Sequence, residues 1–227
     1  MLRIALFFAL VFSLALPGWS EASAQSLGTE AERAPRASSV DTGYGAVVIS
    51  IRSELYLDEP LDVFFLREGG DPANNADVIR FGRKQDFFAL GNSTVRYQVR
   101  VYALPIGTYR LIAHGMDCPK IPAENERCLI DRRGLTGTKE VSRPSRGYGE
   151  ITPRFEVREG ALTNAGDFAL TARNTIEWSA IPADELRQTA RRFRNLISGP
   201  EPEIPEGFAL KYGLFPRSFQ DDRGRRY

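Results

Sequence analysis

The residue best suited to acid-base chemistry occurs once in this sequence. His114 is the only histidine, and it follows the apolar residues 111–113 at the expected end of a strand. General-base catalysis or a catalytic triad would have to use this imidazole, but no serine or cysteine elbow accompanies it. We therefore expect His114 to be a solvated or hydrogen-bonded residue at a strand end, and we identify no catalytic residue.

The two cysteines, Cys118 and Cys128, lie in a stretch rich in glycine, proline, arginine and serine, residues 115–149. In an exported chain such a pair is typically oxidised, so we expect a disulfide that fixes the loop 117–127. One histidine and two oxidised cysteines do not make a tetrahedral zinc site. We expect no metal and no cofactor.

Adjacent carboxylates occur at Asp58-Glu59 and at Asp221-Asp222. Their spacing does not fit a calcium-binding EF-hand loop, and neighbouring side chains on a strand point to opposite faces. A glycosidase needs two carboxyl groups that converge on one bond. These pairs therefore do not identify an active site.

Arginine and tyrosine are the better candidates for binding. In the stretch 115–149, the candidate binding residues are Tyr148, Arg132, Arg133, Arg143 and Arg146. Tyr44 and Tyr148 are flanked by glycines, and we expect both to be exposed. A second candidate surface is the polar face of a helix near the C-terminus, with Arg187, Arg191 and Arg194, where guanidinium groups could hold phosphate or carboxylate.

The N-terminus has the pattern of a cleavable export signal. Arg3 precedes an uninterrupted apolar run, residues 4–16, and Ala22-Ser23-Ala24 offers small residues for cleavage after Ala24. The run is shorter than the roughly 20 residues that cross a bilayer, and no later segment is apolar enough to do so. We therefore expect a periplasmic or secreted protein without a transmembrane span after signal removal.

The composition excludes some partners. The net charge is +1, from 30 basic and 29 acidic side chains, so no electrostatic argument favours nucleic acid or a membrane surface. We expect the signal peptide 1–24 to be followed by a disordered linker at 25–43, because that stretch has little to bury.

Alternation of apolar and polar side chains dominates from residue 44 onwards. Val95, Tyr97, Val99 and Val101 alternate with polar residues, and Tyr109, Leu111 and Ala113 follow after a turn. Ile151, Phe155 and Val157 resume the pattern. The short strands predict an antiparallel β-sandwich over 44–180, immunoglobulin-like or transthyretin-like, with residues 115–149 as a disulfide-bearing insertion.

Only one segment has helical spacing. Leu186, Ala190, Phe193 and Ile197 predict an amphipathic C-terminal helix over 181–199, whose apolar stripe should lie on the sandwich. An extended tail, 200–227, should follow, and Phe208, Leu210, Tyr212 and Phe215 could pack against the body. This arm could also serve as a docking segment within a larger complex.

Two stretches resemble known sandwich proteins. Residues 104–111 (LPIGTYRL) resemble the strand entry of carboxypeptidase-regulatory-like and transthyretin-like domains. Residues 155–160 (FEVREG) and 166–170 (GDFAL) are similar to a pattern in uncharacterised bacterial periplasmic proteins of the DUF2846 type. The resemblance implies a β-sandwich of the cell envelope and brings no catalytic residues.

These observations favour a non-enzymatic binding or assembly module of the cell envelope. Its partner would be an envelope protein or glycan that the residues do not identify, and its site would lie in the stretch 115–149, because loops on a rigid scaffold commonly hold binding residues. The alternative is an envelope hydrolase that acts on glycan or peptide. Two carboxylates converging in a cleft, one with a raised pKa, would favour that alternative.

Overall fold

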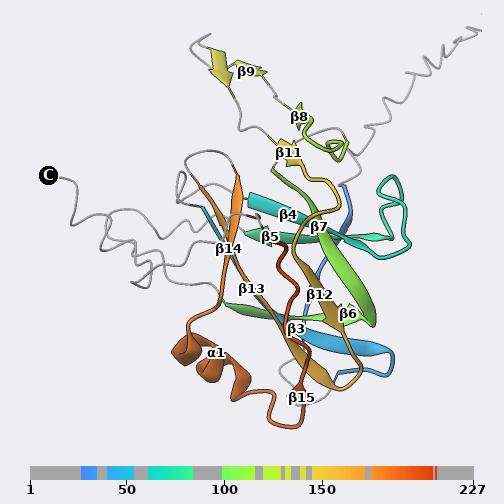
Figure 1. The fold of residues 1–227 in the computed structure, drawn as a ribbon, viewed down its shortest axis with the longest axis vertical. Helices are drawn as coiled ribbons and strands as arrows, with labels where there is room; N and C mark the ends of the chain where they lie inside the picture. The colour runs from blue at the N-terminus through green and yellow to red at the C-terminus, as the bar shows by residue number, and fades with distance from the viewer. Residues whose placement is uncertain are drawn as a thin grey trace, which may run out of the picture.

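The computed structural model describes residues 27–34, 40–53, 61–83, 99–115, 120–128, 131–133, 139–141, 145–171, 175–206 and 208. These residues form two β-sheets around one core, with a helix on the outside of one sheet (Figure 1). The expectation of a mainly β protein is confirmed.

The first sheet has seven strands, and all but one of its pairings are antiparallel. In spatial order they are β1 (Thr29–Glu30), β5 (Val78–Arg83), β4 (Leu61–Arg67), β7 (Gly107–Gly115), β11 (Ser145–Gly147) and β8 (Arg127–Cys128), and β12 (Arg154–Val157) also pairs with β7.

The second sheet has six strands and carries the helix. Its order is β14 (Ile176–Ser179), β13 (Ala161–Leu170), β3 (Tyr44–Ser53), β6 (Arg100–Pro105) and β2 (Glu32–Arg33), and β15 (Ile197–Ser198) also pairs with β13. The helix is α1 (Ala183–Ala190), and a separate hairpin joins β9 (Asp131–Arg133) to β10 (Lys139–Val141).

Aromatic side chains from both sheets fill the core. Phe65 is fully buried, and its ring centroid lies 5.3 Å from that of Phe168 in the opposite sheet. Phe81 packs edge-on against the other side of Phe65 at 5.5 Å, and Phe155 lies at 5.1 Å. Offset and edge-to-face contacts of this kind join the two layers into one core.

The prediction of an antiparallel sandwich is wrong at the centre of the second sheet. There β3 and β13 run parallel, from Leu162 opposite Ala46 to Leu170 opposite Ser53. The strand that precedes β13 in the sequence is β12, which belongs to the first sheet. The chain therefore crosses from one sheet to the other before it enters β13. Alternation of side chains reports which face is buried but not the direction of a strand.

A bulge in β7 changes which residues face the core. Phe64 is opposite Ala113, and Phe65 is opposite Leu111, so Ile112 is an additional residue in the ladder. Tyr109 and Leu111 therefore belong to the main core, whereas Ala113 joins a smaller apolar cluster on the outside of the sheet. The prediction that Ala113 continues the face of Leu111 is wrong, because one extra residue moves the following side chains to the opposite face.

The expected linker at 25–43 is ordered in part. Thr29–Glu30 pairs with β5 of the first sheet, and Glu32–Arg33 pairs with β6 of the second. Between them Ala31 is 7% exposed and belongs to the main core. The edges of β5 and β6 offer unpaired backbone groups, and their hydrogen bonds order a segment that has little apolar side-chain area.

The predicted helix 181–199 is shorter than expected. Helix α1 ends at Ala190, and three tight turns lead to Phe193 and Leu196. The chain then joins the edge of β13, where Ile197 N–H donates to Gly160 and Gly199 N–H donates to Leu162. The free edge of β13 can accept these bonds only from an extended segment, so strand pairing replaces the last helical turns.

The chain after β15 closes the side of the molecule between β12 and β13. Glu203 exchanges two backbone hydrogen bonds with Arg154 at the start of β12, and Phe208 packs against the main core. Of the four tail residues that could pack against the body, Phe208 does so, and Leu210, Tyr212 and Phe215 lie outside the described residues. Among the described residues, no helix has the length and apolar character needed to cross a membrane.

Candidate functional site: a pocket beneath helix α1

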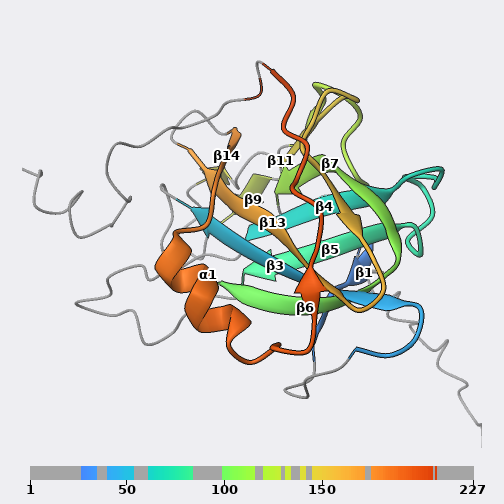
Figure 2. The same cartoon turned by 60° about the horizontal axis from the view of Figure 1, so that its bottom comes forward.

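Helix α1 lies against the outer face of the second sheet, close to β3 and β13 (Figures 1 and 2). Pro182 precedes the first turn of α1, where no hydrogen bond needs its missing N–H. The negative charges of Asp184 and Glu185 in the first turn are stabilised by the positive end of the helix dipole. Leu186 and Ala190 are four residues apart and therefore share one face. Both are only half-buried, and α1 has no buried residue.

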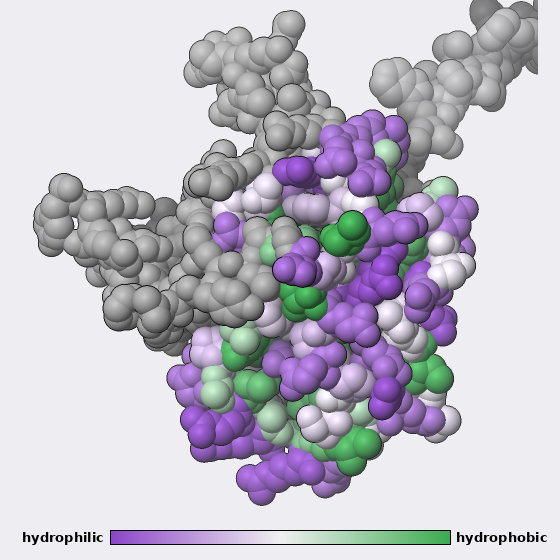
Figure 3. Space-filling model, in the orientation of Figure 1, coloured by the Kyte–Doolittle hydropathy of each residue, from purple (hydrophilic) through white to green (hydrophobic). Residues whose placement is uncertain are grey.

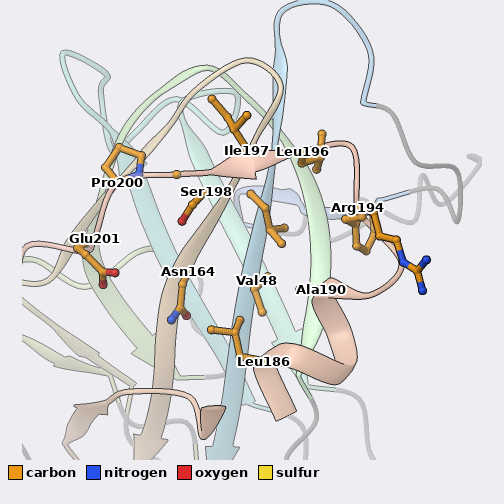
Figure 4. Close-up of a pocket in the computed structure, with 13 residues that line it drawn as sticks. Val48, Asn164, Leu186, Ala190, Arg194, Leu196, Ile197, Ser198, Pro200 and Glu201 are labelled. Atoms are coloured by element: carbon orange, nitrogen blue, oxygen red, sulfur yellow. The ribbon is translucent and has the colours of Figure 1, made fainter. Parts of the chain in front are cut away.

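The space between this face and the sheet is a pocket of about 350 Å³. Val48 of β3 and Leu162 of β13 line its sheet side, and Leu186 and Ala190 line the helix side. Val48 is fully buried. In Figure 4, Val48, Leu186 and Ala190 lie around one space, and its volume is at the lower end of the range for ligand sites.

The remaining wall is the chain from Phe193 to the segment after β15. Phe193 is 6% exposed, and Gly199 passes directly over β13. A Cβ at Gly199 would lie 2.4 Å from the Thr163 hydroxyl oxygen and 2.9 Å from the Thr163 Cα. This close approach requires glycine, and it fixes the wall of the pocket against the sheet.

Four polar residues also line the pocket. Asn164 accepts a hydrogen bond from Gly166 N–H at 3.1 Å through its side-chain oxygen. The other three are the exposed residues Arg194, Ser198 and Glu201. The rest of the lining is mainly apolar.

Of the three arginines predicted as a docking face on the helix, only Arg194 lines this pocket. Arg194 lines it, and its Nε donates to the Arg191 carbonyl at 3.2 Å. Arg187 lies on α1 and donates to the Ala183 carbonyl at 3.1 Å. Neither Arg187 nor Arg191 lines the pocket, and all three side chains are exposed.

Tyr148 is not the exposed contact residue that the flanking glycines suggested. Its hydroxyl accepts a hydrogen bond from Ile176 N–H at 2.8 Å and lies 2.9 Å from His114 Nδ1. Burial raises the pKa of this phenol above its ordinary value. His114 is fully buried, so it is the hydrogen-bonded residue we expected but not a solvated one. Arg146 lies over the Tyr148 ring at 5.9 Å.

The other predicted candidates are placed in part. Arg132 and Arg133 lie on β9, which pairs with β10, but their side chains are outside the described residues. Arg143 and Cys118 are also outside them, as is the side chain of Cys128. The disulfide therefore stays a prediction. Tyr44 is 41% exposed, beside Ile106 at 42%.

The sequence did not indicate the buried ion pair on the same outer face as the pocket. Arg52 of β3 donates from Nε to both carboxylate oxygens of Asp167 at 2.9 Å, and the two side chains are 2% and 0% exposed. Ser179 Oγ bonds to the same carboxylate at 3.1 Å. The parallel pairing of β3 and β13 brings these residues together, and no local pattern encodes it.

A second hollow, of about 600 Å³, lies beside the N-terminal segment and is mostly charged. Its lining consists of Glu30, Ala31, Glu32, Arg33, Gly82, Arg100 and Tyr102. Asp62 is opposite Gly82, and burial raises its pKa to about 6 despite the opposing effect of Arg80. Arg80 forms ion pairs with both Asp62, at 3.8 Å, and Glu30, at 3.5 Å. Two carboxylates, one with a raised pKa, therefore meet at Arg80 beside this hollow, which is the kind of arrangement that the hydrolase alternative requires.

Among the described residues, no group of three or more histidine, cysteine, aspartate or glutamate side chains is placed to hold a metal ion.

The chain was compared with known proteins. No protein-family model matches it, and no curated protein does. Among solved structures it is similar to a leucine-rich repeat protein from Bacteroides thetaiotaomicron VPI-5482, with a TM-score of 0.27 and 14% identity over 58% of this chain and 14% of that one. Such a low TM-score supports no argument about fold or function.

Proposed function

We propose that the protein is a non-enzymatic binding module of the cell envelope and that its ligand places an apolar group in the pocket beneath α1. The envelope location follows from the export signal predicted at residues 1–24. From the sequence we expected the partner to be an envelope protein or glycan. We now propose any envelope molecule that has an apolar group able to enter the pocket.

The observation that carries this proposal is the half-buried apolar face of α1. Leu186 and Ala190 face the sheet without closing on it, and the half-buried Leu162 of β13 lies on the sheet side. Apolar surface that packs poorly loses dispersion contacts and leaves a space that a ligand can fill. An apolar group that enters this space replaces those contacts.

Binding is favoured over hydrolysis by the positions of the titratable groups. The Asp167 carboxylate is held by Arg52, and the Asp62 carboxylate is paired with Arg80. His114 is bonded to Tyr148 inside the core. Asp167 and His114 are fully buried, so a substrate does not reach them, and Asp62 beside the second hollow is the group on which the hydrolase alternative would depend.

We also propose an immunoglobulin-like or transthyretin-like sandwich as the finer fold type. The stretch 104–111 makes a turn between β6 and β7, and Tyr109 opens a core strand at 1% exposure. Its hydroxyl donates to the Pro105 carbonyl at 2.9 Å. A tyrosine bonded to the backbone a few residues upstream resembles the tyrosine corner of β-sandwiches.

The test is a titration with the uncharged fluorescent probe N-phenyl-1-naphthylamine. We expect saturable binding by the wild-type chain and a loss of affinity of roughly tenfold or more in Ala190→Phe, because the new ring occupies the pocket. The matched control is Ala183→Phe, at an exposed position of α1 that does not line the pocket. It should bind as the wild type does.

Two results would contradict the proposal. One is a wild-type chain that does not bind the probe, and the other is equal affinity in both phenylalanine variants. A second substitution, Leu186→Ser, makes the pocket polar without filling it and should also weaken probe binding. Circular dichroism of each variant establishes that the fold is retained.

A further inference from the structure

The N-terminal segment, residues 27–34, lies in a groove between the two sheets. Its strand β1 pairs with β5 of the first sheet (Figure 2), and its strand β2 pairs with β6 of the second. Between and after these strands, Ala31 N–H donates to the Arg80 carbonyl at 2.9 Å, and Ala34 N–H donates to the Val101 carbonyl at 3.0 Å. Backbone hydrogen bonds therefore hold this segment, as they do when an extended peptide adds to the edge of a sheet.

The groove also fits the side chains of this particular segment. Leu27 packs against the apolar cluster outside the first sheet, and Ala31 is 7% exposed in the main core. Gly28 has a φ of +68°, its N–H donates to the Asn75 side-chain oxygen at 3.0 Å, and a Cβ there would lie 3.1 Å from Val78. The groove thus takes leucine, then glycine, and alanine three residues after the glycine, which is the sequence of the chain's own segment.

Few side-chain contacts oppose release of the segment. Its strands have two residues each, and all four of their side chains are exposed. The second hollow, of about 600 Å³, is lined by Glu32 of the segment and by Gly82 and Tyr102 of the sheets, so the segment does not close completely on the body. The predicted cleavage after Ala24 leaves two residues before Leu27, so the segment can leave the groove as a chain end.

We infer that residues 27–34 are an exchangeable segment and that the groove of one copy takes the segment of a second copy. Because the two sequences are identical, the exchanged segment makes the same contacts in the second copy as in its own. Residues 35–43, which join it to β3, span up to about 30 Å when extended and can reach a neighbouring molecule. Reciprocal exchange gives a closed dimer with two-fold symmetry. This inference goes beyond the proposed function, because it concerns a surface outside the pocket beneath α1.

Disulfide trapping between two different chains tests the inference. Glu32 and Ala103 lie opposite each other in the antiparallel pair of β2 and β6, where the spacing suits a disulfide. Mature Glu32→Cys and Ala103→Cys chains of different mass are incubated together and oxidised, and mass spectrometry measures the covalent heterodimer. In the control, Arg33→Cys replaces Glu32→Cys and places the thiol on the opposite face of the strand. We expect at least about tenfold more heterodimer from the Glu32→Cys mixture than from the control.

The substitution Ala31→Glu sharpens the test, because it should have opposite effects in the two chains. In the Ala103→Cys chain it expels that chain's own segment from the core, so the yield of heterodimer should rise. In the Glu32→Cys chain it keeps the segment out of the partner's groove, so the heterodimer should be lost. A mixture of wild-type and Ala103→Cys chains measures cross-linking through the native cysteines.

Equal yields from the Glu32→Cys mixture and the Arg33→Cys control would overturn the inference, and so would the same effect of Ala31→Glu in both chains. The double variant Glu32→Cys/Ala103→Cys makes a negative result decisive. If it forms the disulfide within one chain and the mixture forms no heterodimer, the segment is placed as described and does not exchange. Binding of N-phenyl-1-naphthylamine tests the pocket separately, so such a failure leaves the proposed function unchanged.

Discussion

The two ends of the described chain each connect the edges of the two sheets, on opposite sides of the molecule. The N-terminal segment, residues 27–34, bridges β5 of the first sheet and β6 of the second. The C-terminal segment, residues 197–208, bridges β13 of the second sheet and β12 of the first. Each places one apolar side chain against the core, Ala31 in one case and Phe208 in the other.

The two segments differ in the hollows beside them. The N-terminal hollow is lined by acidic and basic side chains, which water solvates well. The C-terminal hollow is lined mainly by aliphatic side chains, which water solvates poorly. Around α1 and β15, apolar residues interrupt an otherwise hydrophilic surface (Figure 3). The comparison teaches that a similar bridge can close a sheet edge beside hollows of different chemistry, and the proposed function uses the apolar one.

The largest expected effect comes from removing the buried ion pair between Arg52 and Asp167, which lies on the side of the C-terminal segment. Asp167→Ala leaves Arg52 buried without its carboxylate, and we expect the free energy of unfolding to fall by about 3–5 kcal/mol. Urea denaturation measures the change. Ser179→Ala removes one hydrogen bond to the same carboxylate and should cost about 1 kcal/mol. Equal losses in both variants would show that the ion pair is not the anchor.

The next test sharpens the description of the N-terminal side. Burial raises the pKa of Asp62 from 3.8 to about 6, so the folded state binds its proton more tightly than the unfolded state. The wild type should therefore lose stability as pH rises from about 4 to 6, and the penalty should persist above pH 6. At pH 7, Asp62→Asn should be more stable than the wild type by about 2–3 kcal/mol.

At pH 4 the two proteins should differ by less than about 1 kcal/mol, because Asp62 is then protonated in the folded state and only about half ionised in the unfolded state. Urea denaturation at pH 4, 5, 6 and 7 measures this trend. Glu30→Gln is the control, since its ion pair with Arg80 is largely exposed and should contribute less than about 1 kcal/mol. A wild type that gains stability from pH 4 to 6 relative to Asp62→Asn would contradict the prediction.

The smallest test compares a glycine from each segment. Gly28 has a φ of +68°, and a Cβ there would lie 3.1 Å from Val78, whereas a Cβ at Gly199 would lie 2.4 Å from the Thr163 hydroxyl oxygen. We expect Gly28→Ala and Gly199→Ala each to lose about 1–2 kcal/mol in urea denaturation. Only Gly199→Ala should also weaken binding of N-phenyl-1-naphthylamine, since it moves a wall of the pocket. Weaker binding in both variants would mean that the two sides are not independent.

Alternation predicted part of the buried positions that the structure describes. Tyr109 and Leu111 are buried, as are Phe155 and Val157. It failed at β6, where Tyr102 and Leu104 are buried and the predicted Val99 and Val101 are only half-buried. It also failed where the backbone departs from a regular strand. Ala113 faces the other side after the bulge at Ile112, and Ile151, before β12 begins, is 75% exposed.

The candidate site was predictable only in fragments. The helical spacing of Leu186 and Ala190 indicated the face that lines the pocket, and Arg194 was among the predicted docking residues. The pocket is also lined by Val48, which is distant from α1 in sequence, and by Gly199, which follows the end of α1. No helical or strand period links these positions, because they meet only through the parallel pairing of β3 with β13 and the return of the chain to β13.

The sequence by itself determined the mainly β class, the buried faces of several strands and the presence of a helix within 181–199, because side-chain periodicity acts over a few neighbouring residues. The tertiary structure decided the direction of β13, both bridging segments, the end of α1 and the ion pair between Arg52 and Asp167. These features depend on which sheet edge has unpaired backbone groups, and that is known only after distant strands have paired.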